Sequence, residues 1–397
     1  MERIGIYGGT FNPPHVGHIQ GAKQAITALG LTKLYLIPTH VAPHKKLPDN
    51  SPTARQRLEM LRIAAEDCPE TVVSDLELNR EGPSFTCETV RQLRKAHPEA
   101  RLVLIMGSDM FLSFQTWKEP AYILRNAELA VLYRGEREET AAVEAKKAEL
   151  ESQGAGVTLV KNEIVPISST QLRRMLAFQC ADSFLPAGVG AYIRENRLYD
   201  TAAQWKNLPM EQMEQVVVSL LKPNRVAHVL GCRDTAVELA KRWGEDETDA
   251  ARAGVLHDIT KALDGPLQLT LCAAYGKLLD EFSRKTPKTL HALTGSLVAQ
   301  RLFGENKQVV SAIRWHTTGR ANMTRLEKII YIADYMEPNR DFPGVEDLRR
   351  LAFSDLDAAL KLGLEMTVAH VQRQGSTVSP ESREALTWLE SMNTQKG

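Results

Sequence analysis

The chain has 397 residues, which exceeds the usual size of about 100–200 for one domain, so we predict two domains. Lys and Arg together number 49, as do Asp and Glu, and this balance argues against a nucleic-acid-binding coat or attachment to an anionic membrane. Hydrophobic residues make up 43% of the chain, yet no apolar run approaches the roughly 18 residues of a membrane helix. We therefore expect small-molecule partners, with no nucleic acid and no membrane.

The cysteines and the N-terminal sequence indicate the cellular compartment in which we expect the protein. The five cysteines are scattered and form no CxxC pair: Cys68, Cys87, Cys180, Cys232 and Cys272. This usage is typical of a reducing environment. The chain enters a strand at once, without a basic and then apolar leader. We expect a cytoplasmic protein, for which a homo-oligomer is one compatible assembly.

The first motif joins a strand to a helix. Residues 3–7 predict a buried strand, and Gly-Gly-Thr-Phe-Asn-Pro-Pro-His-Val-Gly-His follows at 8–18. Paired glycines allow a sharp turn and a close approach to a ligand, and apolar residues from Ala22 onward have helical spacing. The free N–H groups of a helix start favour an anion, and His15 and His18 share one face there. The motif predicts a polyphosphate site.

Short apolar segments alternate with helical ones through the first half. The predicted strands are residues 4–7, 33–37, 71–73, 101–106, 129–133 and 157–160. Such alternation favours an α/β fold, a Rossmann-like doubly wound parallel sheet covered by helices. Ligands of such sheets lie at the carboxyl ends of the strands. The turn at 8–9 and the turn Gly107-Ser108-Asp109 both fall there.

The second half has a different pattern. Residues 200–208 are polar and are predicted to be a linker after a first domain at 1–199. From about residue 209 apolar residues recur at helical spacing, and strand patterns become scarce. We predict a second, all-α domain at 209–390, folded as a helical bundle.

A second phosphate element lies at Ile167-Ser168-Ser169-Thr170-Gln171-Leu172-Arg173-Arg174. Hydroxyls at a helix start stand one turn before two guanidiniums, so amide, hydroxyl and arginine donors can converge on phosphate oxygens. Taken alone, Ser-Ser-Thr before a helix is more often an ordinary helix cap.

Together the two elements resemble the nucleotidyltransferases, and within them the nicotinate-mononucleotide adenylyltransferases. The 8–18 stretch resembles the superfamily. The segments that narrow the resemblance are Ser84-Phe85-Thr86, Gly107-Ser108-Asp109, Trp117, residues 167–173 and the closing residues 185–193. The resemblance covers residues 1 to about 199.

This resemblance implies transfer of AMP from ATP to nicotinate mononucleotide, with release of pyrophosphate and formation of nicotinate adenine dinucleotide. Mg²⁺ would bridge phosphate oxygens, and positioning and charge neutralisation would supply the catalysis. The implied catalytic residues are His15, His18, Lys45 and Arg173. The implied ATP contacts are Gly8, Gly9, Thr10, Phe11, His15, His18, Gly107, Asp109, Ile167, Ser168, Ser169, Thr170 and Arg173. The implied nicotinate-nucleotide contacts are Thr86, Trp117 and Arg134, although Trp117 could equally be a core residue.

Histidines and aspartates recur through the second half on five successive predicted helices. They are His228, His257, Asp258, His291, His316 and Asp334. A lone buried histidine is usually a hydrogen-bonded core residue. Six such side chains in one bundle indicate a metal centre instead, because separate helices can bring their ligands inward. Imidazole and carboxylate together suit Fe, Mn, Zn or another first-row divalent ion.

The order of these residues, with the segments 255–261, 315–319 and 332–340, resembles the HD phosphohydrolases and their diadenosine tetraphosphate hydrolase branch. The resemblance runs from about 209 to about 390. It implies that iron or another divalent transition metal is held by His228, His257, Asp258 and Asp334. His291 and His316 would bind a second ion or the substrate phosphates. Arg225 and Lys261 would contact phosphate, Lys261 as a catalytic residue, or would be solvated side chains.

The combined hypothesis is a bifunctional enzyme that makes nicotinate adenine dinucleotide and cleaves diadenosine tetraphosphate symmetrically to two ADP. One alternative keeps both reaction classes but changes the substrates. The acceptor would then be another phosphate such as phosphopantetheine, and the hydrolysed nucleotide guanosine tetraphosphate or a deoxynucleotide. In another alternative the helical half is a nucleotide sensor without catalysis, although a pure sensor has no need of all six positions.

Overall fold

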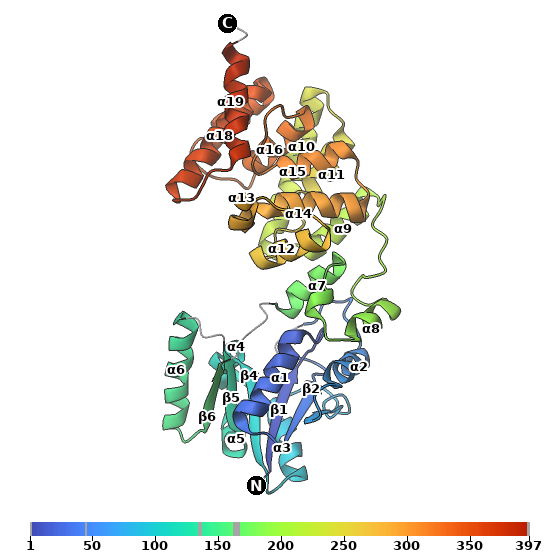
Figure 1. Ribbon diagram of the computed structural model, residues 1–397, viewed down its shortest axis with the longest axis vertical. Helices are drawn as coiled ribbons and strands as arrows, with labels where there is room; N and C mark the ends of the chain where they lie inside the picture. Colours follow the sequence, from blue (N-terminus) through green and yellow to red (C-terminus); the bar gives the residue numbers. More distant parts are fainter. Residues whose placement is uncertain (1, 44–45, 134–136, 162–166, 395–397) are drawn as a thin grey trace. The chain divides into compact units, whose positions relative to one another are not determined.

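The computed structural model describes residues 2–43, 46–133, 137–161 and 167–394. The chain divides into two compact units, Met1–Ala202 and Ala203–Gly397. The first unit contains the sheet, and the second is built from helices (Figure 1). No helix of the described ranges combines the length and the apolar character that crossing a membrane requires.

The first unit is built on one parallel sheet with the strand order β3-β2-β1-β4-β5-β6. The strands are β1 (Arg3–Gly9), β2 (Lys33–Pro38), β3 (Thr71–Val73), β4 (Arg101–Gly107), β5 (Glu128–Tyr133) and β6 (Val157–Lys161). The prediction of a doubly wound α/β sheet is confirmed. Since β1 and β4 are neighbours, with Tyr7 opposite Ile105, their two glycine-containing ends meet at one edge of the sheet.

The strands hold together because both faces of the sheet are covered. Alternate residues point to opposite sides, so Leu102 and Leu104 join one buried cluster with α3 and α5, whereas Val103 and Ile105 join another with α1 and α2. The helices of this unit are α1 (Val16–Leu29), α2 (Ala54–Ala65), α3 (Thr86–Ala96), α4 (Ser108–Leu112), η1 (Phe114–Thr116), α5 (Pro120–Asn126), α6 (Arg137–Ser152), α7 (Ser169–Ala177), η2 (Asp182–Phe184) and α8 (Val189–Glu195).

The second unit is helical, as predicted. Its helices are α9 (Met210–Leu220), η3 (Pro223–Arg225), α10 (Val226–Trp243), α11 (Glu247–Leu256), α12 (Gly265–Ala274), α13 (Glu281–Lys285), η4 (Pro287–Thr289), α14 (Leu290–Val298), the π-helix η5 (Ala299–Phe303), α15 (Lys307–Trp315), α16 (Arg325–Met336), α17 (Val345–Ser354), α18 (Leu356–Arg373) and α19 (Pro380–Thr394).

Helix α16 lies at the centre of this bundle. Residues 329–333 are all buried, and the helix packs against α10, α11, α15 and α18. A helix that is buried on nearly every side belongs to the interior of a bundle. Asp334 follows directly in the same helix, and its side chain is 18% exposed.

Candidate functional sites

The loop after β1 differs in one respect from the sequence prediction. Gly8 and Gly9 are the last residues of β1, and the left-handed backbone is at Phe11, whose φ is 45°. The glycines therefore do not make the turn. A Cβ at Gly8 would meet no atom within 4 Å, so this position offers open space in which a ligand can approach the backbone.

His15 and His18 lie together at the start of α1. His15 precedes the helix and His18 is in its first turn, and their ring centroids are 3.6 Å apart. The backbone N–H of His15 donates to Nδ1 of His18 over 3.1 Å. A neutral His18 must therefore carry its proton on Nε2, which makes that nitrogen a hydrogen-bond donor. Nδ1 of His15 is buried without a hydrogen-bond partner among the described residues.

Both imidazoles are neutral at physiological pH. Burial lowers the pKa of His15 to about 4. Burial, and in second place the neighbouring His15, lower the pKa of His18 well below its ordinary value. Their contribution to binding a phosphate in the free protein is therefore directed N–H donation rather than positive charge.

This burial predicts a pH-dependent stability of the first unit. Below its ordinary pKa of 6.5 His15 takes up a proton in the unfolded chain but not in the folded one until about pH 4, so stability falls as the pH falls through this range. Between pH 7 and pH 5 we expect His15 to account for a loss of about 2 kcal/mol. The free energy of unfolding is measured at pH 7 and pH 5 by urea titration, with hydrogen exchange in β1 as the signal. The parent should show the full loss between the two pH values, and His15→Gln should show a smaller one. Equal losses in both proteins would contradict the assignment.

Helix α7 is anchored to the loop that carries the histidines. Arg173 Nη1 donates to the carbonyl of Asn12 over 2.9 Å, and Ser169 Oγ donates to the carbonyl of Pro13 over 3.5 Å. Ser168 caps the helix by accepting from the backbone N–H of Gln171, and Thr170 Oγ1 accepts from Arg173 Nη2 over 3.1 Å. The two predicted phosphate elements, distant in sequence, are thus brought together by direct hydrogen bonds.

A buried polar network beneath this loop was not anticipated from the sequence. Tyr199 donates its hydroxyl proton to Asn12 Oδ1 over 2.7 Å, and Asn12 Nδ2 donates to Ser51 Oγ over 2.9 Å. The buried Arg57 donates to the carbonyls of Thr10 and Thr39 over 2.6 and 2.7 Å. These bonds fix the backbone between Thr10 and Asn12. In the sequence, the one available signal for this network was the polar Asn12 within the 8–18 motif.

The remaining predicted residues of this site lie as follows. Gly107 precedes α4, and Asp109 is exposed in the first turn of that helix. Burial, and in second place the negative charge of Asp109, raise the pKa of Tyr7 to about 12. Thr86 begins α3. Trp117 is half-buried against Phe114, with ring centroids 5.4 Å apart, as a core residue would be. Ile167 is buried beside Ser168. Lys45 and Arg134 lie outside the described residues.

In the second unit the six predicted side chains converge, but from a different set of elements than expected. They do not fall on five successive helices, because α12, α13 and η4 intervene between α11 and α14. His228 lies on α10, His291 on α14 and Asp334 on α16. His257 and Asp258 directly follow α11, and His316 directly follows α15. After these three helices, α14 brings His291 back to the cluster formed by the other five side chains.

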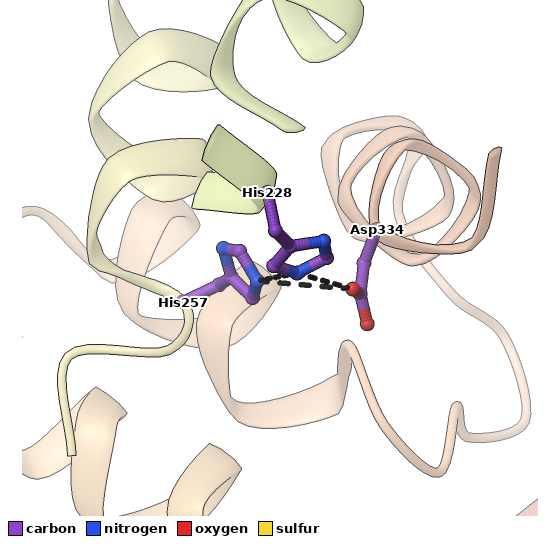
Figure 2. A group of neighbouring side chains, drawn as sticks. All are labelled: His228, His257 and Asp334. Carbon is purple, nitrogen blue, oxygen red and sulfur yellow. Dashed lines mark hydrogen bonds and ion pairs between the residues drawn. The ribbon is translucent and has the colours of Figure 1, made fainter. Parts of the chain in front are cut away.

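Three of the six side chains form the first group of suitable metal ligands. Nε2 of His228 lies 3.1 Å from Asp334 Oδ1 and 3.3 Å from Nε2 of His257, and His257 Nε2 is 3.8 Å from the same carboxylate oxygen. Figure 2 shows both rings turned toward the Asp334 carboxylate. Nitrogen and oxygen donors so close together can share one ion.

Asp258 lies between this group and a second one. Its Oδ2 is 3.8 Å from Nε2 of His228 and 3.7 Å from Nε2 of His257. Its Oδ1 is 3.5 Å from Nε2 of His291 and 3.8 Å from Nε2 of His316. The carboxylate therefore presents one oxygen to each pair of histidines, an arrangement that suits one ion or two with Asp258 between them.

In each of the four histidines, Nδ1, the ring nitrogen that points away from the cluster, contacts an oxygen acceptor. Nδ1 of His257, His291 and His316 contacts the carbonyls of Gly254, Lys288 and Ile313 at 2.7, 2.9 and 2.7 Å. Nδ1 of His228 contacts the Glu337 carboxylate at 3.1 Å. Because these acceptors require the proton on Nδ1, each neutral ring directs an unprotonated Nε2 inward. Nε2 of the buried His316 has no hydrogen-bond partner among the described residues, so the donor set fits a metal ion.

The protonation states also fit. Burial raises the pKa of Asp258, but His257, His316, His291 and Lys261 outweigh it and hold the pKa well below its ordinary value. Burial lowers the pKa of His257 to about 4, and burial together with Lys261 lowers that of His291 to about 3. Neutral imidazoles and ionised carboxylates are the forms that bind metals.

Basic side chains surround the cluster. Arg225 is paired with Asp258 Oδ2, and Lys261 Nζ is 2.9 Å from Nε2 of His291. Arg340, to which the sequence assigned no role, donates to Asp334 Oδ1 over 2.7 Å. Its position in the quoted 332–340 segment, six residues after Asp334, was the available signal. The cluster is thus acidic at its centre and basic at its rim.

Glu337 is a second residue to which the sequence assigned no role, and its replacement should weaken metal binding. Its carboxylate is almost completely buried, contacts Nδ1 of His228 and accepts from the backbone and side chain of Asn339 at 2.7 and 2.8 Å. Glu337→Gln should weaken metal retention by about 10- to 100-fold, because the His228 ring loses its charged partner. Chelator competition measures the change. The exposed Glu346→Gln is the matched control, and equal chelator sensitivity of both variants would contradict this role.

Comparison with known proteins assigns both units. A cytidylyltransferase-like family model matches residues 6–175, and an HD domain model matches residues 225–339. A protein of Bacillus subtilis named symmetrical bis(5'-nucleosyl)-tetraphosphatase is 36% identical over 180 residues, which cover 45% of this chain and 96% of that protein. One of Aeromonas salmonicida, named probable nicotinate-nucleotide adenylyltransferase, is 37% identical over 211 residues, covering 49% of this chain and 96% of that protein.

Solved structures add one neighbour of similar identity. A predicted HD superfamily hydrolase involved in NAD metabolism from Clostridium acetobutylicum is 38% identical, with a TM-score of 0.46, and the match covers 47% of this chain and 98% of that one. The sequence relatives, each covered almost completely, establish the membership. The chain therefore belongs to two families at once, joining a member of the nicotinate-nucleotide adenylyltransferase family to an HD-domain protein of the family that includes the symmetrical bis(5'-nucleosyl)-tetraphosphatase.

Proposed function

We propose that the chain is a bifunctional enzyme. Its first unit transfers AMP from ATP to nicotinate mononucleotide, and its second hydrolyses diadenosine tetraphosphate symmetrically to two ADP. The relatives that bear the names of these activities support the two reaction classes, and the two clusters of side chains support the choice of residues. We propose residues 1–199 and 209–390 as the two catalytic domains, with 200–208 as the linker.

The transferase proposal depends mainly on the junction between the β1 loop and α7. The Arg173–Asn12 hydrogen bond brings the helix start at Ser169 next to the loop that ends in His15 and His18. Backbone N–H groups of two helix starts and the Nε2–H of His18 can then donate to the triphosphate. Arg173 adds a fixed positive charge, and bound Mg²⁺ would neutralise further charge on the phosphates.

The reaction needs no covalent bond to the protein. The phosphate of nicotinate mononucleotide attacks the α-phosphorus of ATP, and the bond to the β-phosphate oxygen breaks as pyrophosphate leaves. The side chains gain their effect by holding the attacking and leaving oxygens in line and by donating to the developing charge. We assign the phosphate contacts to His15, His18, Arg173 and Lys45, and the nicotinate contacts to Thr86, Trp117 and Arg134.

An acceptor panel tests this half. Purified full-length protein is incubated with ATP, Mg²⁺ and equal concentrations of nicotinate mononucleotide, nicotinamide mononucleotide or phosphopantetheine, and products are identified by mass. We expect nicotinate adenine dinucleotide to form with the highest kcat/KM. Preferential formation of dephospho-coenzyme A from phosphopantetheine would overturn the acceptor assignment while leaving adenylyl transfer in place.

The hydrolase proposal depends on the position of Asp258, which presents one carboxylate oxygen to each pair of histidines. We propose that His228, His257, Asp258 and Asp334 hold one divalent ion, with iron as the first candidate, and that His291 and His316 hold a second ion or contact the substrate phosphates. A bound ion lowers the pKa of water and polarises a phosphoryl oxygen.

The basic rim would bind the substrate. Arg225, Lys261 and Arg340 lie at the cluster, and a tetraphosphate brings negative charge that these side chains can bind. Thr317, whose Oγ1 is 3.2 Å from Nε2 of His291, adds a hydroxyl next to that histidine. We propose that these groups orient the phosphate chain so that water attacks the phosphorus on one side of the central bridging oxygen.

Isotope labelling tests the cleavage position. Hydrolysis of diadenosine tetraphosphate in H₂¹⁸O should give only ADP, with the label in one of the two molecules formed from each substrate. AMP with ATP would show asymmetric cleavage and contradict the proposal. Absence of any phosphate-bond cleavage by metal-loaded protein would favour the sensor alternative.

A further inference from the structure

A cavity of about 360 Å³ opens in the second unit beside α14 and α15. It is lined by Leu293 and Leu297 of α14 and by Val310, Arg314 and Trp315 of α15. Residues on a helix are rotated by about 100° per position, so Leu293 faces nearly opposite His291 on α14. The cavity shares no lining residue with the cluster, and its volume is in the range of small-molecule sites.

The charges around this cavity are unequal. Lys277, Lys307 and Arg314 contribute three positive charges, and Glu305 is the acidic residue of the lining. Glu305 is already neutralised, because Arg252 donates to both its carboxylate oxygens over 2.6 and 2.8 Å. Within the described residues, none of the three cationic side chains takes part in an ion pair or a hydrogen bond. Among the lining residues, these three positive charges therefore have no compensating carboxylate.

Arg314 is the best placed of these cations. Its guanidinium lies 4.3 Å from the centre of the Trp315 ring, and burial lowers its pKa, although Glu381 and Asp280 oppose that effect. Both carboxylates are engaged elsewhere, Asp280 with the backbone N–H of Ser283 at 2.7 Å and Glu381 with Ser379 Oγ at 2.6 Å. A partly desolvated cation that lacks a direct anionic partner favours an anionic ligand.

The other walls are apolar or hydroxylic. The buried Leu293 and half-buried Leu297 belong to the same apolar patch, Trp315 offers an aromatic surface, and Ser296 and Ser311 complete the lining. An apolar and aromatic surface next to three cations matches a molecule with a flat aromatic group and adjoining phosphates. We propose that this cavity binds a nucleoside diphosphate at a site separate from both catalytic centres. The proposal does not depend on the proposed hydrolase activity.

Equilibrium dialysis with radiolabelled ADP tests the site on the metal-loaded full-length chain. Parent protein should bind one more ADP per chain than Lys307→Gln/Arg314→Gln, or bind it at least about tenfold more tightly at that site, since a charge-assisted hydrogen bond contributes about 1.5–3 kcal/mol. Lys361→Gln/Arg373→Gln, on α18, is the matched control and should retain the parent isotherm. Superimposable isotherms for all three proteins would overturn the proposal.

Two further arms keep the test decisive. Lys277→Gln/Lys307→Gln changes only exposed side chains, so it reports on the site even where replacement of Arg314 impairs folding, and it should weaken the same binding event. Inorganic pyrophosphate should displace ADP from this site only at about tenfold or higher excess, because it lacks the base. Displacement by pyrophosphate at equal concentration would overturn the nucleoside assignment. Since these arms measure binding, a chain that fails to hydrolyse diadenosine tetraphosphate would still give either result.

Discussion

Asp258→Ala should reduce hydrolysis of diadenosine tetraphosphate by at least about 10³-fold, since its carboxylate faces both histidine pairs and is the proposed ligand shared between them. Adenylyl transfer by the same protein should be unchanged, because His15, His18 and Arg173 belong to the other unit. Both rates are measured on one preparation, with bound metal quantified by mass spectrometry.

Asp347→Asn provides the matched control for this variant. Asp347 is an exposed aspartate of α17 that pairs only with Arg350 among the described residues, so both activities should survive its replacement. Hydrolysis by Asp258→Ala at a rate near that of the parent would contradict the metal centre. Loss of adenylyl transfer as well would indicate global unfolding or coupling between the units, and circular dichroism distinguishes these two causes.

His18→Ala should reduce adenylyl transfer by about 10²- to 10³-fold and leave hydrolysis intact. The estimate follows from the loss of one directed hydrogen-bond donor to charge that develops in the transition state. The backbone N–H of His15 fixes the orientation of the His18 ring, so no neighbouring group can substitute at the same position. Because the ring is neutral, the effect should be mainly on kcat rather than on the affinity for ATP.

The control histidine is His97, which follows α3 and contacts the hydroxyl of Tyr35 at 3.0 Å. His97→Ala removes an imidazole from the same unit without touching the phosphate elements, and its transfer rate should remain within about twofold of the parent. A His18→Ala enzyme with the parent kcat would remove this residue from the catalytic set.

The sheet could be predicted because each strand is a short apolar run between helical segments, and this alternation favours strands that run parallel. The turn after β1 was interpreted less accurately. Glycine is the usual residue for left-handed backbone, so Gly8 and Gly9 were the natural candidates, whereas the structure places φ of 45° at Phe11. Tertiary contacts overrode local preference there, since Arg57 binds the Thr10 carbonyl from a distant helix.

The sequence singled out the six histidines and aspartates that the structure brings together, but it did not predict how they are arranged. The order of histidines and aspartates is visible in the sequence, whereas the division of Asp258 between two pairs depends on side-chain direction. The five-helix expectation failed because α12 and α13 lie between His257 and His291 and contribute no ligand. Glu337 contacts His228 and Arg340 contacts Asp334, and a sequence pattern does not distinguish residues with such contacts from ordinary surface charges.

The existence of two independent catalytic centres in one chain is tested most directly by a single reaction analysed by mass. Purified full-length protein is given ATP, nicotinate mononucleotide, isotopically labelled diadenosine tetraphosphate, Mg²⁺ and a divalent transition metal. We predict that nicotinate adenine dinucleotide with pyrophosphate and labelled ADP accumulate together, that His18→Ala removes only the first product pair, and that Asp258→Ala removes only the second. Absence of either product from the parent, or loss of both from either variant while the protein remains folded, would contradict the account.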